Sequence, residues 1–599
     1  MVKKKKVPIN YTSRDFDSIR RDLIDYAKRY YPDTFRDFSE ASFGSLMIDT
    51  VSYVGDILSF YLDYQVNESF LDTSIEYNNI VRQGKQMGYK FRGASTSYGT
   101  CAFFVKVPAN STGLGPDSNY IPTLKKGAVV SSNANASFIL TEDLDFNNES
   151  NVIVVAETNT TTGLPTTYAI RAFGRVASGE MGVETVKIGS FERFKKVRLA
   201  TPDIVEIVSI FDSEGHRYYE VESLSQDVVY KNVVNRKSRN ANEPAAILKP
   251  FAVPRRFVID RTRTNTVLQF GYGSDTEINK STLVDPTDVV LQQVGRDYVS
   301  DTSFDPTKLL DTDKFGVGPS NTTLTVRFRR NSTGRTNATA GSISNVTRYL
   351  LEYRDPSILT TTKKNIVDSS LEVTNLEPIV GNVANPSREQ LKQTIGGVFA
   401  SQNRAVTELD YKALVYAMPP QFGGIKRCSI YRDSDSFRRN LNLYVISEDN
   451  NDNLVQTNST IKENLKTWLS QNKMINDTID ILDAKIVNIE INYNAISELG
   501  VDKFDALTAA NTRLRQLYAN KLDVGEPFNI SQIYNVLNKT PGIADVTNVR
   551  IVNKFGGKYS NIGYDINDNI TADGRYINVP KNVILEIKFL NTDIKGTIK

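Results

Sequence analysis

The sequence is poor in the residues that build metal sites and nucleophilic sites, with only 2 cysteines and 1 histidine among 599 residues. Cys101 and Cys428 are far apart in the chain, so neither a disulfide framework nor a four-ligand zinc site of cysteine and histidine can form within one chain. Any Ser-His-Asp or Cys-His mechanism would depend on His216 alone. We therefore interpret the cysteines as reduced thiols of a protein assembled in a cytoplasm.

An excess of charge of one sign is also missing. Lys and Arg total 72 and Asp and Glu total 69, which gives a net charge of +3. This balance argues against nucleic acid as a partner. The basic run from Lys3 to Lys6 has no apolar stretch of ~7 to 15 residues behind it, so we expect no signal peptide. No window approaches ~18 consecutive apolar residues, so we expect no membrane insertion.

The remaining composition is that of an ordinary folded protein, with 40% hydrophobic and 24% charged residues. At ~150 residues per domain, this length predicts roughly four domains. The first hundred residues show helical spacing of apolar positions: over 13–30, opened by Thr12 or Ser13 and ended by Pro32, over 45–67, and over 74–88. This pattern predicts an N-terminal helical unit.

The pattern changes after about residue 97 to short apolar runs such as CAFFVKV, NVIVVAET and TLTVRF, separated by turn residues, which predict strands up to about residue 380. We expect boundaries near Ala200 and between Thr302 and Thr322. Helices and strands then alternate to the C-terminus, as in compact α+β modules. The expected fold class is α+β multidomain, with a helical unit, β-rich middle domains and C-terminal α+β modules. The corresponding ranges are 1–96, 97–200, 201–380, 381–480 and 481–599.

Motifs that carry chemistry are weak. His216 follows a Ser-Glu-Gly turn, where an exposed structural histidine is the usual case. Oxygen-bearing residues alternate from Asp565 to Asp573 as in a calcium loop, but Ile570 and Tyr576 occupy positions that need Gly and Glu. We predict no catalytic, cofactor-binding or metal-binding residue, no cofactor, and no enzymatic activity. A carboxylate pair of the glycosidase type follows no sequence spacing, so the sequence leaves that possibility open.

Several segments nevertheless resemble a known family. NYTSRDFDSIRRDLIDYAK, FSEASFGSLMIDTVSYVGDILSFYLDYQVNESFLDT and QMGYKFRGAS are similar to the N-terminus of the baseplate wedge subunit of contractile-tailed (T-even-type) phages, in the baseplate J-like family. A second match lies in SREQLKQTIGGVFASQNRAVTELDYKALVYAMPPQFGGIKR, and a third in VGEPFNISQIYNVLNKTPGIADV. The family's R-x-V-T-x-x-D-Y pattern is met by Arg404, Val406, Thr407, Asp410 and Tyr411. Thr407 is also a good N-cap for a helix beginning at Glu408, so the motif has a structural reading.

The resemblance implies a structural subunit of a virion's tail baseplate, assembled in the host cytoplasm. Its implied partners are copies of itself, as a dimer or ring around the central hub, and other wedge proteins, including a sheath-initiator-type protein and a second wedge protein. It also implies transmission of the change that triggers sheath contraction. We place the self-association surface in residues 385–599. The apolar stripe of the second helix predicts a partner-helix face formed by Leu46, Val54, Ile57, Leu58, Tyr61 and Leu62.

Two other classes of protein remain as alternatives. A tail-associated cell-wall hydrolase would need an essential Glu or Asp, and none stands out in the sequence. A receptor-binding tail protein would suit the Asn- and Thr-rich β region, but fibres of that kind usually contain repeats, and we find none.

Overall fold

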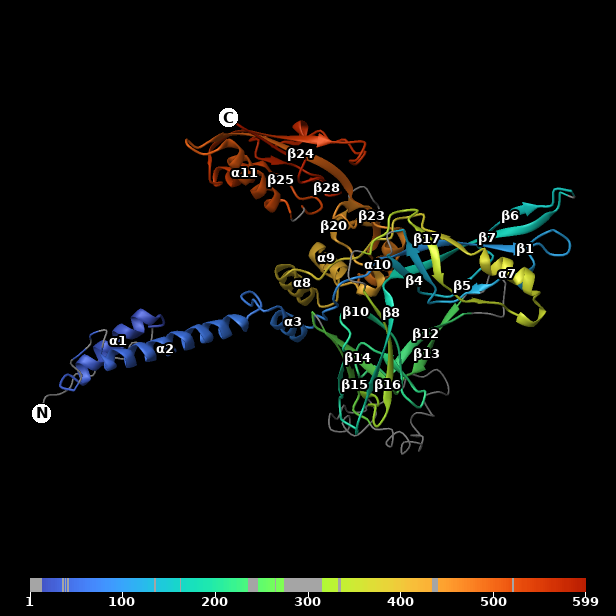
Figure 1. The fold of residues 1–599 in the computed structure, drawn as a ribbon, viewed down its shortest axis with the longest axis horizontal. Coiled ribbons are helices and arrows are strands. Elements are labelled where there is room, and N and C mark those ends of the chain that lie inside the picture. Colours follow the sequence, from blue (N-terminus) through green and yellow to red (C-terminus); the bar gives the residue numbers. More distant parts are fainter. Residues whose placement is uncertain are drawn as a thin grey trace. The chain divides into compact units, whose positions relative to one another are not determined.

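The computed structural model describes residues 13–599 except 35–36, 38, 40–41, 134–135, 162, 235–245, 264, 274–314, 332–335, 434–439 and 520–521. The chain forms two compact units (Figure 1). The first contains Met1–Tyr89 and Ser387–Ile395, and the second contains Lys90–Pro386 and Gly396–Lys599. The observed elements confirm the expected α+β multidomain class.

The first unit is helical, as expected. Its helices are α1 (Phe16–Tyr30), α2 (Phe43–Glu68), α3 (Tyr77–Gln86) and the start of α8 (Arg388–Ser401). The N-cap of α1 is Asp15, whose carboxylate accepts a hydrogen bond from Ser18 N, and not the expected Thr12 or Ser13. Thr12 lies outside the described residues. Asp is as good an N-cap as Ser, so the helix begins where the carboxylate can reach its first free N–H groups.

A close approach between α3 and α8 depends on a glycine. A Cβ atom on Gly84 would lie 2.7 Å from Cδ1 of Ile395, and Ile395 is fully buried. The absent side chain lets the two helices pack within the first unit.

The second unit begins with an antiparallel seven-stranded sheet in the order β17-β3-β4-β7-β1-β19, with β6 pairing to β7. Helix α7 (Thr361–Ser369) packs against β1. The strands are β1 (Tyr98–Pro108), β3 (Val129–Ser132), β4 (Ser137–Leu140), β6 (Val152–Thr158), β7 (Pro165–Ser178), β17 (Ile343–Arg348) and β19 (Glu372–Thr374). Three short strands, β2 (Thr123–Leu124), β5 (Leu144–Asp145) and β18 (Leu351–Glu352), form a separate small sheet.

Another seven-stranded sheet lies between β7 and β17 in the sequence, in the order β8-β16-β10-β11-β14-β15-β9. Its strands are β8 (Glu180–Lys187), β9 (Lys196–Arg198), β10 (Ile204–Phe211), β11 (Arg217–Glu220), β14 (Arg256–Arg261), β15 (Thr266–Phe270) and β16 (Thr323–Arg330). The hairpin of β12 (Val228–Val234) and β13 (Ala246–Ala252) pairs apart from it. The expected boundary near Ala200 falls inside this sheet, because β8 and β9 belong to it. Most of the expected 302–322 boundary lies outside the described residues.

The C-terminal part contains two α+β modules. In the first, α9 (Glu408–Tyr416) and α10 (Ser459–Ser470) pack with β20 (Arg427–Arg432), β21 (Asn440–Glu448), β22 (Leu454–Val455) and β23 (Thr478–Asp483). In the second, α11 (Lys503–Leu517) and α12 (Ile530–Asn538) pack with β24 (Lys485–Ser497), β26 (Ile543–Lys554), β28 (Val583–Glu586) and β29 (Ile594–Ile598). The short strands β25 (Phe528–Asn529) and β27 (Tyr576–Ile577) pair with each other. Strand β24 is central, with β26 on one side and β28 and β29 on the other.

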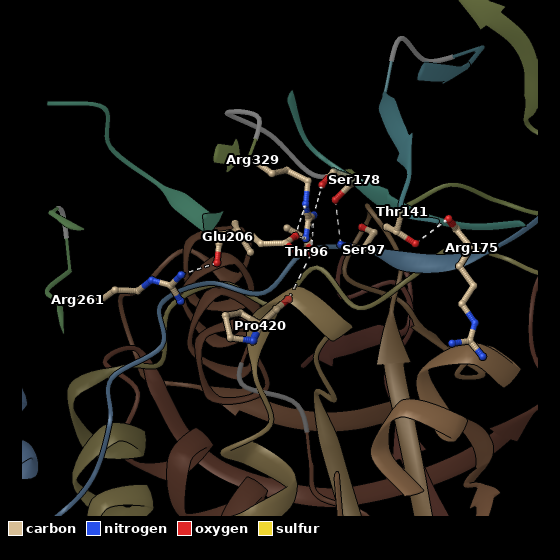
Figure 2. A network of polar contacts seen from close by, with 10 residues as sticks. Thr96, Ser97, Thr141, Arg175, Ser178, Glu206, Arg261, Arg329 and Pro420 are labelled. Carbon is tan, nitrogen blue, oxygen red and sulfur yellow. Dashed lines mark hydrogen bonds and ion pairs between the residues drawn. The ribbon is translucent and has the colours of Figure 1, made fainter. Parts of the chain in front are cut away.

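A buried polar network joins the two β-rich parts to the C-terminal modules (Figure 2). Arg329 donates to the carbonyl oxygen of Ser178 at 2.7 Å and to Oγ1 of Thr96 at 3.2 Å. Thr96 in turn donates from its backbone N–H to the carbonyl oxygen of Pro420 at 3.2 Å. A single arginine thus links chain segments from three parts of the second unit, and buried polar groups require such partners.

Candidate interaction surface

The contact between α1 and α2 combines ion pairs with packing of Ile19 against Gly55. Arg14 pairs with Asp63 at 2.7 Å, and Arg20 pairs with Asp49. A Cβ on Gly55 would lie 3.1 Å from Cδ1 of Ile19, so a small residue is needed there. No α1 residue is buried, and the buried residues of α2 are Ser45, Ser52 and Glu68. The α1–α2 contact therefore buries no large apolar side chain.

The predicted partner-helix face lies on the side of α2 that α1 leaves uncovered. At about 100° per residue, positions 54, 57, 58 and 61 project opposite to 45, 52, 56 and 63, the side that carries the contact with α1. Leu46, Val54, Leu58, Tyr61 and Leu62 are 49–66% exposed, and Ile57 is half-buried. The structure thus brings the six predicted residues together on one exposed surface of the first unit. Their role in binding stays a prediction.

The exposed apolar surface of α2 extends beyond the six predicted residues. Its further members are Phe43, Met47, Val51, Tyr53, Phe60 and Val66, all 49–76% exposed. Most residues of these two sets fall on two neighbouring stripes with alternating spacings of four and three residues, which also include Thr50 and Tyr64 and leave out Phe43, Leu62 and Val66. The aromatic stripe is Leu46, Thr50, Tyr53, Ile57, Phe60 and Tyr64, and the aliphatic stripe is Met47, Val51, Val54, Leu58 and Tyr61. A count of apolar residues at heptad spacing in both registers would have found the second stripe.

The end of α2 is anchored by Glu68, which the sequence analysis did not single out. Its carboxylate accepts hydrogen bonds from Ser74 Oγ at 2.9 Å, Ile75 N at 2.7 Å and Asn79 Nδ2 at 2.9 Å. The hydrogen bond from Asn79, together with those from the backbone and Ser74, outweighs desolvation and lowers the pKa of Glu68 to about 2. An ionised Glu68 therefore fixes the start of α3 relative to the end of α2.

The family motif is placed at the start of α9. Thr407 Oγ1 accepts a hydrogen bond from Asp410 N, and the Asp410 carboxylate accepts one from Thr407 N at 2.8 Å, which forms a capping box. The expected N-cap and the helix start at Glu408 are confirmed. Tyr411 is buried and donates to Asp477 at 2.7 Å, whereas Val406 is exposed. Arg404 contacts Gln402 at 2.7 Å. The motif thus builds a helix start and anchors it through Tyr411.

The residues weighed for chemistry occupy turns and cores. His216 Nδ1 lies 3.2 Å from Asp212, which also accepts a hydrogen bond from the His216 backbone. Cys101 and Cys428 are buried, and burial raises the pKa of each thiol to about 12. In the calcium-like segment, Asp565 accepts from Asn567 N and the Thr571 hydroxyl contacts Asp573, as in local turns. Across the described residues, no group of three acidic, histidine or cysteine side chains could hold a metal ion.

None of the helices in the described ranges combines the length and apolar character needed to cross a bilayer.

Comparisons with known proteins give one match to a family model. Residues 15–86, which contain α1, α2 and α3, match the N-terminal domain of bacteriophage baseplate protein. No curated protein matches. Solved structures with a match include the cryo-EM structure of the anti-feeding prophage baseplate, six-fold symmetrised. That chain is 10% identical, the alignment covers 97% of this chain and 99% of that chain, and the TM-score is 0.26, too low for any conclusion to rest on it. Residues 15–86 are thus similar to a bacteriophage baseplate protein N-terminal domain, and this match supports a structural role in a tail baseplate.

Proposed function

We propose that this protein is a wedge subunit of a contractile-tail baseplate, of the baseplate J-like kind, and that α2 binds helices of other wedge proteins. One observation carries the proposal: residues 15–86 match a baseplate domain, and the long helix of that domain exposes its apolar side. An exposed apolar surface of this extent on a protein marks a site of interaction. The proposed role is structural and non-enzymatic.

The shape of the α2 surface supports more than one helical neighbour. The 26 residues of α2 span about 39 Å at 1.5 Å per residue. Its two heptad stripes point in adjacent directions, and one neighbouring helix can cover only one stripe of this kind. We therefore propose that α2 is an inner helix of a bundle, with one neighbour on the aromatic stripe and another on the aliphatic stripe.

The chemistry of the neighbours follows from the charges of α2. Its acidic residues are Asp49, Asp56 and Asp63, which fall on the side facing α1, and Glu68, which is engaged with α3. The two stripes carry no charged residue. The neighbouring helices should therefore present apolar side chains, and full burial of one large side chain contributes about 1.5–3 kcal/mol.

We also propose that residues 385–599 associate with a second copy to form a ring around the tail hub. Leu499 and Phe504, in and after the turn between β24 and α11, are among the most exposed apolar side chains, as is Ile475 before β23. Exposed apolar groups on loop tips suit contacts between subunits. Movement of this ring would carry the signal for sheath contraction.

The test is a pair of variants on α2. Ile57→Asp with Tyr61→Asp should abolish co-purification of the tagged full-length chain with the other baseplate proteins expressed from the same tail genes. Leu114→Asp is the matched control, because Leu114 is 88% exposed and lies in the second unit. If the α2 variant stays folded and still co-purifies as the control does, the assignment of the partner face is wrong.

A further inference from the structure

Strand β6 is an edge strand whose first four residues, Val152 to Val155, carry no charge and pair regularly with β7. Within the part of the chain that the structure describes, β6 pairs with β7 alone, in antiparallel register from Val152 opposite Arg171 to Thr158 opposite Pro165. Figure 1 shows β6 at one end of its sheet. An edge strand offers unpaired backbone N–H and C=O groups along its outer side. The outer side of β6 can therefore accept another strand.

The side chains of β6 are exposed on both faces of the sheet. All seven residues are exposed, and the consecutive β-branched residues from Val152 to Val155 are each 45–54% exposed. The other edges of the sheet differ: β19 has three residues including Glu372, and β17 ends in Arg348 and has two register irregularities. Short length, charge and irregular pairing are the features that normally prevent edge-to-edge association. The Val152 to Val155 run has neither charge nor irregular pairing, whereas the end of β6 contains Glu157 and two register irregularities.

The sequence of β6 is complementary to itself in one antiparallel register. A two-fold axis through Val154 places Ile153 opposite Val155 and Val152 opposite Ala156, so apolar side chains meet apolar side chains. In the same register Glu157, which pairs with Lys106 at 3.1 Å, falls beside the uncharged Asn151 just before the partner strand. This register therefore pairs the apolar run with itself and brings no two acidic side chains together.

Shifting the axis by one residue makes the pairing worse. With Ile153 on the axis, Glu157 falls beside the turn before β6 of the other copy, which carries Glu149, and like charges placed next to each other disfavour that pairing. With Val155 on the axis, Ile153 faces Glu157. Of these three registers, only the one through Val154 matches apolar with apolar and separates the acidic side chains.

We propose that β6 pairs with β6 of a second copy of this chain, antiparallel about Val154, so that the two sheets join into one. A two-fold axis perpendicular to the sheet keeps the core face of both copies on the same side, so the joined sheet has one continuous core face. This contact is separate from the association proposed for residues 385–599, and it does not depend on that proposal.

Disulfide trapping in the full-length chain tests the register. Val154→Cys should form a covalent dimer under mild oxidation, because directly opposite Cα atoms lie about 4.5–5.5 Å apart, within disulfide range. Val152→Cys is the matched control in the same strand. In the proposed register, position 152 of one copy lies four residues along the strand from position 152 of the other, about 14 Å, so this variant should not cross-link to itself. A mixture of Val152→Cys and Ala156→Cys chains should cross-link again.

The native thiols do not interfere, because Cys101 and Cys428 are buried. We expect at least a tenfold higher dimer yield for Val154→Cys than for Val152→Cys. Equal yields at the two positions, or no dimer at Val154→Cys, would overturn the proposal, as would cross-linking that appears only when other tail proteins are added.

A second measurement uses a mixture of two chains, one with Val155→Cys and the other with Ile153→Cys. Adding Val154→Lys to both chains should lower their cross-linking without changing the melting temperature. Because purified chain is used, these outcomes are independent of the wedge assignment.

Discussion

Arg329 and Glu206 stand directly opposite each other on β16 and β10, and their side chains form an ion pair at 3.0 Å. The Arg329 side chain is only 3% exposed, and its remaining hydrogen bonds go to Ser178 and Thr96 (Figure 2). Arg329 therefore connects its own sheet to the segments around Thr96 and Ser178, which lead into the other parts of the second unit. Removing Arg329 would leave the Ser178 carbonyl without this donor, and an unpaired buried polar group destabilises the folded state.

Arg329→Met should loosen this junction. The change removes the donor of the Ser178 carbonyl and one partner each of Thr96 and Glu206, and we expect a loss of about 1–3 kcal/mol in local stability. Hydrogen exchange of the segments around residues 95–97 and 178–181 measures the loss. Arg327→Met on the same strand is the control, because Arg327 is exposed. Equal protection in the two variants would show that the network does not hold the junction.

Glu68→Gln should release the start of α3 and remove its dependence on pH. The carboxylate of Glu68 has a folded-state pKa of about 2 against an ordinary 4.5, so it stabilises the folded state above pH 4.5. That stabilisation is lost as the pH falls from about 4.5 to about 2. Pepsin cleavage near Phe70 should therefore rise steeply over this range in the wild type, relative to cleavage elsewhere in the chain. The Gln variant should be cleaved readily at pH 4.5 already, and Glu76→Gln serves as the control.

Gly271→Ala should destabilise the second β-sheet domain. A Cβ at this position would lie 2.0 Å from the carbonyl oxygen of Gly316, and backbone cannot move aside as a flexible side chain can. Overpacking of this kind costs about 1–3 kcal/mol or more. Gly189→Ala is the matched control, because nothing lies within 4 Å of its Cβ position. Thermal unfolding should show a lower midpoint for the Gly271 variant alone; an unchanged midpoint would mean that the two segments can separate without cost.

Thr407→Ala should fray the start of α9. The variant loses the N-cap half of the capping box, which typically costs about 1 kcal/mol, whereas Thr407→Ser keeps the accepting oxygen. Hydrogen exchange over residues 408–412 in the full-length chain reports the local opening. Faster exchange in both variants would assign the effect to the lost methyl group and not to the cap.

Much of the architecture could be read from local patterns. The helical period over 45–67 corresponds to α2, and the strand patterns of CAFFVKV and TLTVRF correspond to β1 and β16, because each element repeats its apolar positions with its own period. Thr407 is recognisable as an N-cap for the same reason: the cap depends on residues three apart. The start of α1 is harder to place from sequence, because Asp15, Ser13 and Thr12 are all acceptable caps.

The candidate surface was found only in part. The spacing of apolar residues predicts the apolar stripe of α2. It does not predict the side that faces α1, because Asp49 and Asp63 pair with arginines 29 and 49 residues away in the sequence. Glu68 was missed because its partners lie in a loop whose path local propensity does not specify.

By itself, the sequence determined the absence of a cysteine and histidine metal centre, the order of helical and β-rich regions, and the local helix start at Thr407, because these depend on composition and on neighbours a few residues apart. Only the tertiary structure decided that β8 and β9 join strands up to Arg330 in one sheet, and that α2 turns its polar side inward. It also decided that Arg329 meets Glu206 and Ser178. The contacts of Arg329 join residues more than a hundred positions apart in the sequence. They stabilise the fold only after the chain has closed the loops between these residues, so no local pattern in the sequence reports them.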